Sequence, residues 1–315
     1  MKLKNIFLGL ITVGIAFAGC DEISQPLIPK QVNSKLPTTP PTDTTNNDAS
    51  YQTYKVLLED CMGDQCSNCP SAVAVGDTLI STYSNPTLAP HIILVEDNMG
   101  NFAVPGPSSG YPSYAFSTDY RCVAGNNWCT TFFNPIGYPA GYINRIGYNG
   151  TVVLNINANN WQDTIQNELL PQYPSTPPVE IRIHDSCYVP QRLIGVHFKV
   201  TFMQTLPAGT YFLLPEIVED PIVSWQKDDL FPIGYDSTFV HHFVLRGTFD
   251  LNGIGTQITT PATADSTFTS FQTYDFTKGE NGKAATWNMA NCYIVVFVYN
   301  QATHRVYQTE RVKIE

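Results

Sequence analysis

The chain has 315 residues, with 17 Lys and Arg against 27 Asp and Glu, for a formal net charge of −10. Nucleic-acid binding depends on clustered basic residues, so this acidic composition without a basic run argues against a nucleic-acid partner. The length leaves room for two domains, and the 17 Tyr and 17 Phe residues are typical of exported β-rich proteins.

The first 19 residues have the pattern of a bacterial lipoprotein signal peptide. Lys2 and Lys4 precede an apolar run too short to span a bilayer, and the segment that ends in Gly19 and Cys20 resembles a lipobox. We expect cleavage before Cys20 and acylation of that cysteine, which would anchor the chain to a membrane. The alternative is an ordinary secretory cleavage beside an incidental cysteine. Residues 20–50, rich in Pro and Thr, predict a disordered tether.

Residues 51–172 alternate between strand-like and helix-like patterns, which indicates an α/β domain. Apolar runs predict strands at 55–60 and 91–96, and apolar residues on one face predict a helix over 70–83. Further along, we expect a helical turn at 127–133, a hairpin formed by 142–145 and 151–156, and a helix at 160–170. Strands that alternate with helices in this way are usual for α/β folds.

The chain changes character after a Pro-rich linker at 173–178. From residue 179 to 315 the apolar period becomes two, notably through 194–203 and 239–251, which predicts half-buried strands. Residues 293–299 are apolar on both faces, so we expect a strand that is covered on both sides. The core of this β-rich region would cover one side, and another element, such as the neighbouring domain, would cover the other. Several short strands without a convincing helix favour an all-β immunoglobulin-like sandwich.

The most informative motif is the C-x-x-C-P sequence at residues 66–70. A strand ends near Asp60, a short turn follows, and the motif opens a helix, which places Cys66 at a helix N-terminus. Unpaired N–H groups and the helix dipole favour a thiolate there, so we expect an exposed, ionisable Cys66 that exchanges disulfides together with Cys69. Two alternatives remain: an inert disulfide that closes the helix start, and a zinc site, which would need a fourth ligand besides Cys61, Cys66 and Cys69.

Eight cysteines in an exported chain first indicate disulfides. With Cys20 acylated seven remain, so at least one thiol stays unpaired or pairs with another chain. The pairing that we prefer is Cys66–Cys69, Cys122–Cys129 and Cys187–Cys292, with Cys61 left over. A staple across a loop is the expected role of Cys122–Cys129, in preference to a second redox pair.

No cofactor or metal is expected. The adjacent His241 and His242 lie on a predicted strand and therefore face opposite ways, which makes a shared metal ion difficult.

Two segments carry a resemblance to known proteins. Val56–Pro70 resembles the active-site segment of thioredoxin-like proteins, and Gly137–Arg145 resembles their cis-proline loop. Together with the lipobox, the tether and the later segments HHFVLR and NCYIVVFVYN, they resemble the outer membrane protein 28-related family of Bacteroidetes lipoproteins over most of the mature chain. The resemblance implies a thioredoxin-like domain over 51–172, a β-sandwich over 179–315, and a location at the outer membrane, on its periplasmic face or at the cell surface.

The resemblance also implies roles for four residues. Cys66 would be the attacking thiol, Cys69 the resolving thiol, Asp60 a buried proton acceptor for Cys69, and Pro139, after a cis bond, the residue that shapes the substrate site. Asp60 could instead satisfy hydrogen bonds at a strand end. The chain departs from the usual thioredoxin pattern at Gln65, Cys61 and Ser67–Asn68.

These observations lead to two functional hypotheses. In the first, a lipoprotein anchored in the outer membrane through Cys20 acts as a thiol–disulfide oxidoreductase on exported proteins. In the second, it is a non-catalytic binding or adhesion lipoprotein that recognises a surface ligand, and the thioredoxin-like fold is only a scaffold.

Overall fold

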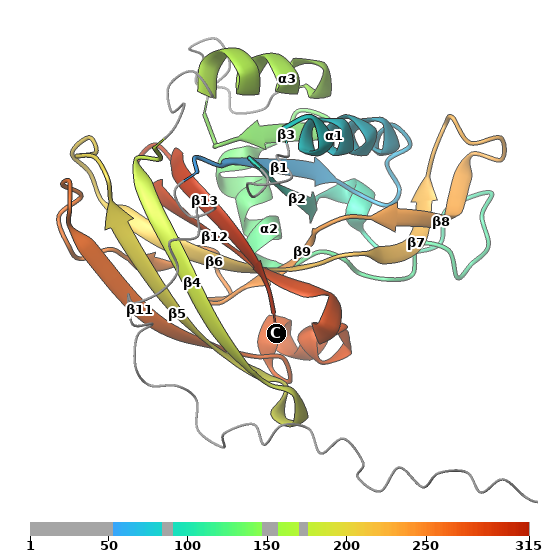
Figure 1. Ribbon diagram of the computed structural model, residues 1–315. Coiled ribbons are helices and arrows are strands. Elements are labelled where there is room, and N and C mark those ends of the chain that lie inside the picture. The colour runs from blue at the N-terminus through green and yellow to red at the C-terminus, as the bar shows by residue number, and fades with distance from the viewer. Residues whose placement is uncertain (1–52, 84–90, 147–156, 170–175, 315) are drawn as a thin grey trace, which may run out of the picture. The chain divides into compact units, whose positions relative to one another are not determined.

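Strands dominate the computed structural model, which describes residues 53–83, 91–146, 157–169 and 176–314 (Figure 1). All of these residues belong to one compact unit. The expected signal peptide, the acylated Cys20, the tether, the strand at 151–156 and the first part of the linker at 173–178 lie outside the described residues.

The elements for which a range was predicted lie close to that range, apart from the segment 239–251, and several strands of the C-terminal region had no predicted range. The helices are α1 (Cys69–Tyr83), α2 (Val123–Trp128) and α3 (Trp161–Asp163), and π-helical turns follow α2 at Cys129–Phe133 and α3 at Thr164–Leu169. The strands are β1 (Val56–Met62), β2 (Ile92–Asn98), β3 (Ala140–Ile143), β4 (Val179–Tyr188), β5 (Leu193–Phe202), β6 (Tyr211–Glu219), β7 (Ile222–Lys227), β8 (Tyr235–His241), β9 (Val244–Thr248), β10 (Thr256–Gln257), β11 (Thr267–Asp275), β12 (Cys292–Asn300) and β13 (Val306–Lys313).

The largest sheet joins strands from both sides of the expected linker. Its order is β13-β12-β6-β9-β2-β1-β3, and β10 pairs with β6. The pairs β1–β2 and β2–β9 are parallel, and the remaining neighbours are antiparallel. A smaller sheet has the order β11-β5-β4, and β7 and β8 form a separate hairpin.

Strand β12 is buried on both faces, as its sequence predicted. Its residues Ile294, Val296 and Val298 belong to the core shared with β4 and β5, which is the core of a two-sheet sandwich. The alternate residues, including Phe297, belong to a second core that also contains Leu57 of β1. The second cover of β12 is therefore the N-terminal part of the chain.

A third core lies on the other side of β1 and β2. There the apolar stripe of α1, including Ala72 and Leu79, packs against Leu58 and Leu94, and Trp161 closes the same core. Spacings of three and four residues along α1 place these side chains on one helix face, which is why this segment forms a buried amphipathic helix.

The segment 239–251 differs from the expected single alternating strand. It divides into β8 and β9, and between them Phe243 has a left-handed backbone with φ of 48°. Because this conformation turns the chain, β9 enters the large sheet while β8 pairs with β7 outside it. The alternation of side chains alone did not reveal this break.

Candidate functional site

The C-x-x-C motif forms a disulfide at the start of α1. Cys66 and Cys69 are bonded to each other with a Cα–Cα distance of 5.5 Å, as predicted. Helix α1 begins at Cys69, and Cys66 lies in the preceding turn, where its N–H donates to the Gly63 carbonyl at 3.0 Å. The helix predicted over 70–83 therefore begins one residue earlier than expected, and Cys66 lies just before its first turn.

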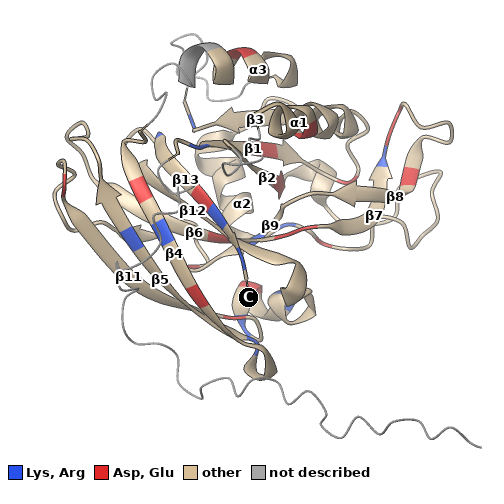
Figure 2. Ribbon diagram, in the orientation of Figure 1, with Lys and Arg blue, Asp and Glu red and all other residues tan. Residues whose placement is uncertain are grey.

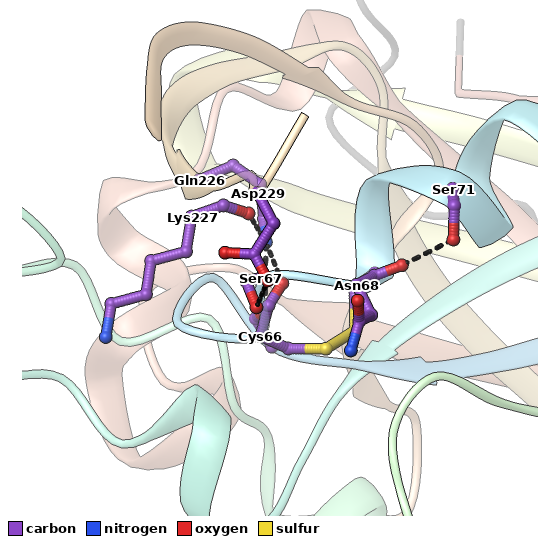
Figure 3. Close-up of a disulfide and its surroundings, with 9 residues drawn as sticks. Cys66, Ser67, Asn68, Ser71, Gln226, Lys227 and Asp229 are labelled. Carbon is purple, nitrogen blue, oxygen red and sulfur yellow. Dashed lines mark hydrogen bonds between the residues drawn. A yellow bond between two sulfur atoms is a disulfide. The ribbon is translucent and has the colours of Figure 1, made fainter. Parts of the chain in front are cut away.

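The β7–β8 hairpin covers the disulfide. The Gln226 side chain donates through Nε2 to the carbonyl oxygens of Cys66 at 2.9 Å and Gly63 at 3.2 Å. The Lys227 N–H donates to the Asp64 carbonyl at 2.8 Å. Figure 3 shows Gln226 beside the turn that carries Cys66.

A further side-chain contact joins the turn between β7 and β8 to the motif. Ser67 donates through Oγ to Asp229 Oδ2 at 2.7 Å (Figure 3). Cys66 retains only 3% exposure, and Cys69 is fully buried. The expectation of an exposed Cys66 is therefore wrong for this oxidised structure, because a hairpin about 160 residues further along the chain binds its backbone and packs Phe239 against the cluster that contains the disulfide.

The loop that contains Pro139 lies beside the disulfide. The Tyr138–Pro139 bond is cis, as predicted, and the ring of Tyr138 packs against the cluster of Met62, Cys66, Cys69 and Val73. A pocket of about 440 Å³ opens next to this loop, lined by Asn68, Ser71, Gly137, Tyr138, Pro139, Asn157, Ala158 and Asn159. The predicted proximity of residue 139 to the motif is confirmed.

Asp60 lies on the sheet face that carries the start of α1. Side chains two residues apart on a strand share a face, and its neighbours Leu58 and Met62 pack against α1 and the disulfide. Asp60 is fully buried, and burial raises the pKa of its carboxyl to about 8. Neither of its oxygens has a hydrogen-bond partner among the described residues, so the alternative role in hydrogen bonding at a strand end is wrong.

The predicted Cys122–Cys129 disulfide is absent, and both thiols are free. The two residues flank α2, and seven helical steps separate their Cα atoms by about 10 Å, which is too far for a disulfide. Instead, Cys122 Sγ accepts a hydrogen bond from the Gly125 N–H at 3.2 Å, and Cys129 Sγ lies 3.6 Å from the Tyr138 hydroxyl.

The predicted Cys187–Cys292 disulfide is also absent. Cys187 lies on β4 opposite Ile194 of the smaller sheet, whereas Cys292 begins β12 in the large sheet. The Cys292 thiol donates to the Asn288 carbonyl at 3.3 Å. The two sulfurs therefore belong to different sheets, and the spacing of the cysteines in the sequence carried no information about this placement.

Cys61 is the thiol that the expected pairing left over, and it is unpaired. It belongs to the core on the opposite face of β1 from Cys66 and Cys69, so the three cysteines do not converge on a zinc ion. Burial, and then the neighbouring Asp97 carboxylate, raise the pKa of the Cys61 thiol. The described part of the chain contains no group of three or more His, Cys, Asp or Glu side chains that could hold a metal ion.

Two residues near the disulfide, Gln226 and Glu96, were not among the residues expected at the site. Gln226 carried no signal, because its contact depends on the course of a distant hairpin. Glu96 did carry one, since an acidic residue continues the apolar run of a buried strand. His241 approaches Glu96 Oε2 to 3.8 Å through Nδ1, whereas His242 contacts Asp220, so the two histidines do diverge as predicted.

The family model of outer membrane protein Omp28 matches residues 126–315, which is more than half of the chain. The chain belongs to the Omp28 family. The matched segment contains Pro139 and the β7–β8 hairpin but begins after Cys66 and Cys69. This membership confirms the predicted outer-membrane lipoprotein family and the predicted localisation. No helix in the described ranges has the length and apolarity needed to cross a bilayer.

Two solved structures from Porphyromonas gingivalis are similar to this Omp28 family member. HBP35 shares 12% sequence identity, with a TM-score of 0.57 over 84% of this chain and 76% of that chain. A domain of the outer membrane lipoprotein Omp28 shares 19% identity, with a TM-score of 0.29 over 44% of this chain and 89% of that chain. The similarity to HBP35 indicates a related fold. No curated protein matches the chain.

Proposed function

We propose that the chain performs thiol–disulfide exchange on exported proteins, with Cys66 and Cys69 as the reacting pair. The observation that carries this proposal is one constellation: a disulfide at the start of α1, the Pro139 loop and its pocket beside it, and Asp60 on the sheet beneath. We also propose that residues 51–172 are a thioredoxin-like region and residues 179–315 an immunoglobulin-like sandwich, joined through the shared sheet.

The reaction begins with the reduced pair. The Cys66 thiolate attacks one sulfur of a client disulfide, forms a mixed disulfide, and releases the second client sulfur as a thiolate. The Cys69 thiol gives its proton to Asp60, and the resulting thiolate attacks Cys66 Sγ. The Cys66–Cys69 bond re-forms, and the client sulfur that was attacked also leaves as a thiolate. The two client thiolates take one proton from Asp60 and one from water, and two electrons have passed from the protein to the client.

Access to Cys66 requires a movement of the β7–β8 hairpin. Cys66 is 3% exposed, and Gln226 and Asp229 hold the hairpin to the turn that carries it. Exchange therefore includes an opening step in which these hydrogen bonds break, and a client occupies the exposed turn and the adjacent pocket.

The decisive experiment is a mixed-disulfide trap with the Cys69→Ser variant. Incubated with oxidised insulin, the reduced variant should form a covalent adduct through Cys66 that mass spectrometry detects. The variant that also carries Cys66→Ser should form none. Cys187→Ser removes a thiol of the smaller sheet and serves as the matched control, because it should leave the adduct of the Cys69→Ser protein unchanged. A folded protein that neither reduces insulin nor traps it would exclude exchange.

A second candidate function is non-catalytic binding of a surface ligand. The burial of both disulfide sulfurs favours it, as do the apolar side chains on the turn between β7 and β8, where Leu230 is 85% and Ile233 62% exposed. In that case the disulfide only fixes the turn beneath the hairpin. A Cys66–Cys69 bond that survives excess dithiothreitol in the folded protein would support this function over exchange.

A further inference from the structure

Glu96 lies beside Asp60 on the neighbouring strand. In the parallel pair of β1 and β2, the two residues are register partners. Neighbouring strands are about 4.8 Å apart, and partners in a parallel pair project to the same face, so the two carboxyl groups lie side by side. This is the face on which α1 and the disulfide pack. In Figure 2, acidic positions on β1 and β2 lie near α1.

Both side chains are completely buried, and no lysine or arginine of the described ranges forms an ion pair with either of them. Asp60 and Glu96 are 0% exposed, and none of their four carboxyl oxygens has a hydrogen-bond donor of normal geometry among the described residues. Among the described residues, the basic side chain in contact with Glu96 is His241, with Nδ1 3.8 Å from Oε2. Burial lowers the pKa of His241 to about 4, so this imidazole is neutral near pH 7.

Other groups add negative rather than positive charge. Burial is the main cause that raises the pKa of Glu96, the His242 backbone N–H lowers it, and three carboxylates raise it further. These carboxylates come from β1, α1 and the β6–β7 turn: Asp60, Asp77 and Asp220. The protonated form of His242 is stabilised by Asp220, which accepts a hydrogen bond at 2.8 Å and raises the pKa of the imidazole.

Buried carboxyl oxygens need donors, and a proton held between two carboxyl groups would supply one to this cluster. We propose that Glu96 and Asp60 form one proton-sharing pair beneath the disulfide, in which the Glu96 carboxyl donates its hydrogen to the Asp60 carboxylate. This inference rests on the proposed exchange function and adds Glu96 as a positioning residue for its proton-transfer step.

The pair controls the proton that Cys69 must lose. Before resolution, Glu96 is protonated and donates its O–H to ionised Asp60, which stabilises the carboxylate that will accept the Cys69 proton. After transfer both carboxyls carry a proton, and the Cys69 thiolate attacks Cys66 Sγ as above. Two adjacent carboxylates cannot both ionise easily, so the pair releases its protons in two separate steps.

The test follows the carboxyl groups directly. In reduced protein labelled with ¹³C at Asp and Glu carboxyls, Asp60 and Glu96 should show coupled titrations with two apparent pKa values. Glu96→Met removes the donor and should raise the apparent pKa of Asp60 by about one unit or more, whereas Glu96→Gln keeps an N–H donor and should restore it. Resolution of a Cys66 mixed disulfide should slow about tenfold near pH 7 in Glu96→Met only.

Asp97→Asn is the matched control. Asp97 is the next residue of β2, is equally buried and faces the opposite side of the sheet. Its replacement should leave the Asp60 titration unchanged. If Glu96→Met fails to fold, the two-step titration of the wild-type protein and the titration of Glu96→Gln still show whether the two carboxyl groups share a proton.

The proposal is overturned if Asp60 titrates in a single step that neither Glu96 variant changes. The result of this titration does not depend on the result of the insulin trap. Coupled carboxyls in a protein that traps no client would leave the pair in place and remove the exchange function. Carboxyl groups that titrate independently in a protein that does trap a client would exclude the proton-sharing pair and support the exchange function.

Discussion

At the scale of single residues, burial determines the chemistry of the site more than sequence spacing does. The position of Asp60, six residues before Cys66, was visible in the sequence, and so was its place on a strand. Its missing hydrogen bonds and its neighbour Glu96 were not, because they depend on which strand pairs with β1. The same holds for the cysteines: spacing identified the Cys66–Cys69 bond and failed for the two longer pairs.

The raised pKa of Asp60 predicts how stability depends on pH. The folded-state pKa of about 8 lies above the value of about 3.9 expected for the unfolded chain, so the folded state binds the proton more tightly. This contribution to stability is complete below about pH 4 and is lost as the pH rises towards 8, at about 1.4 kcal/mol per unit. The Asp60→Asn variant has no carboxyl that titrates at this position, so it does not lose stability in this way. Its free energy of unfolding at pH 7 should therefore be about 2–4 kcal/mol higher than that of the wild type.

Urea unfolding at pH 5, 7 and 8.5 measures this difference. Asp163→Asn, on the exposed side of α3, is the control and should follow the wild-type pH dependence. A wild-type protein and an Asp60→Asn variant with parallel pH profiles would show that Asp60 titrates normally.

At the scale of elements, periodicity located the strands and helices that have a strong local pattern, but it did not show how the β7–β8 hairpin is placed. Helix α1 and strands β1, β2, β5 and β12 lie close to their expected bounds. These elements have local signals, namely apolar stripes of period 3.6 or 2 and continuous apolar runs. The contact of the hairpin with the disulfide has no local signal, since its hydrogen bonds join residues about 160 positions apart.

The hairpin contact predicts the reactivity of the disulfide. The Gln226 side chain donates from Nε2 to three backbone carbonyls, including those of Gly63 and Cys66. Each such bond contributes about 1 kcal/mol, so Gln226→Ala should make opening of the hairpin easier by about 1–3 kcal/mol. Reduction of Cys66–Cys69 by dithiothreitol should then be about tenfold faster, as measured by quenched alkylation and mass spectrometry.

Gln272→Ala provides the matched control for that measurement. Gln272 lies on β11 of the smaller sheet and donates to Thr256 of β10 and to Ser270 of its own strand. Its loss should leave the reduction rate unchanged. Equal rates for Gln226→Ala and the wild type would mean that the hairpin does not control access to the disulfide.

At the scale of the whole molecule, one sheet joins the two regions that the sequence separated. The change from mixed to period-two patterning lies around residues 173–178 of the sequence. The pairing of β9 with β2 was not visible, because nothing in the pattern of a strand identifies its partner in a parallel pair. Strand β12 then contributes to the core on each side of the sheet.

This shared sheet predicts that the described regions unfold together. Phe297 belongs to the core that also contains Leu57 and Trp128, so Phe297→Ala should cost about 3–5 kcal/mol. Cys122, in that core, and Cys292, in the sandwich core, should become reactive towards a thiol reagent at the same urea concentration in both proteins.

Phe271→Ala, at a partly exposed position of β11, is the control and should cost less than about 1 kcal/mol. Two separate urea midpoints for Cys122 and Cys292 would show that the regions behave as independent folding units.

The unpaired thiols of the folded chain impose an order on its maturation. Cys61, Cys122 and Cys292 are enclosed as free thiols, and Cys129 and Cys187 are partly enclosed. Exported chains meet oxidants while still unfolded, when every sulfur is available. An unselective oxidant would link thiols that the native packing keeps apart, and such a cross-linked chain could not close its cores. Correct folding therefore requires that the five thiols become buried or partly buried before an oxidant reacts with them.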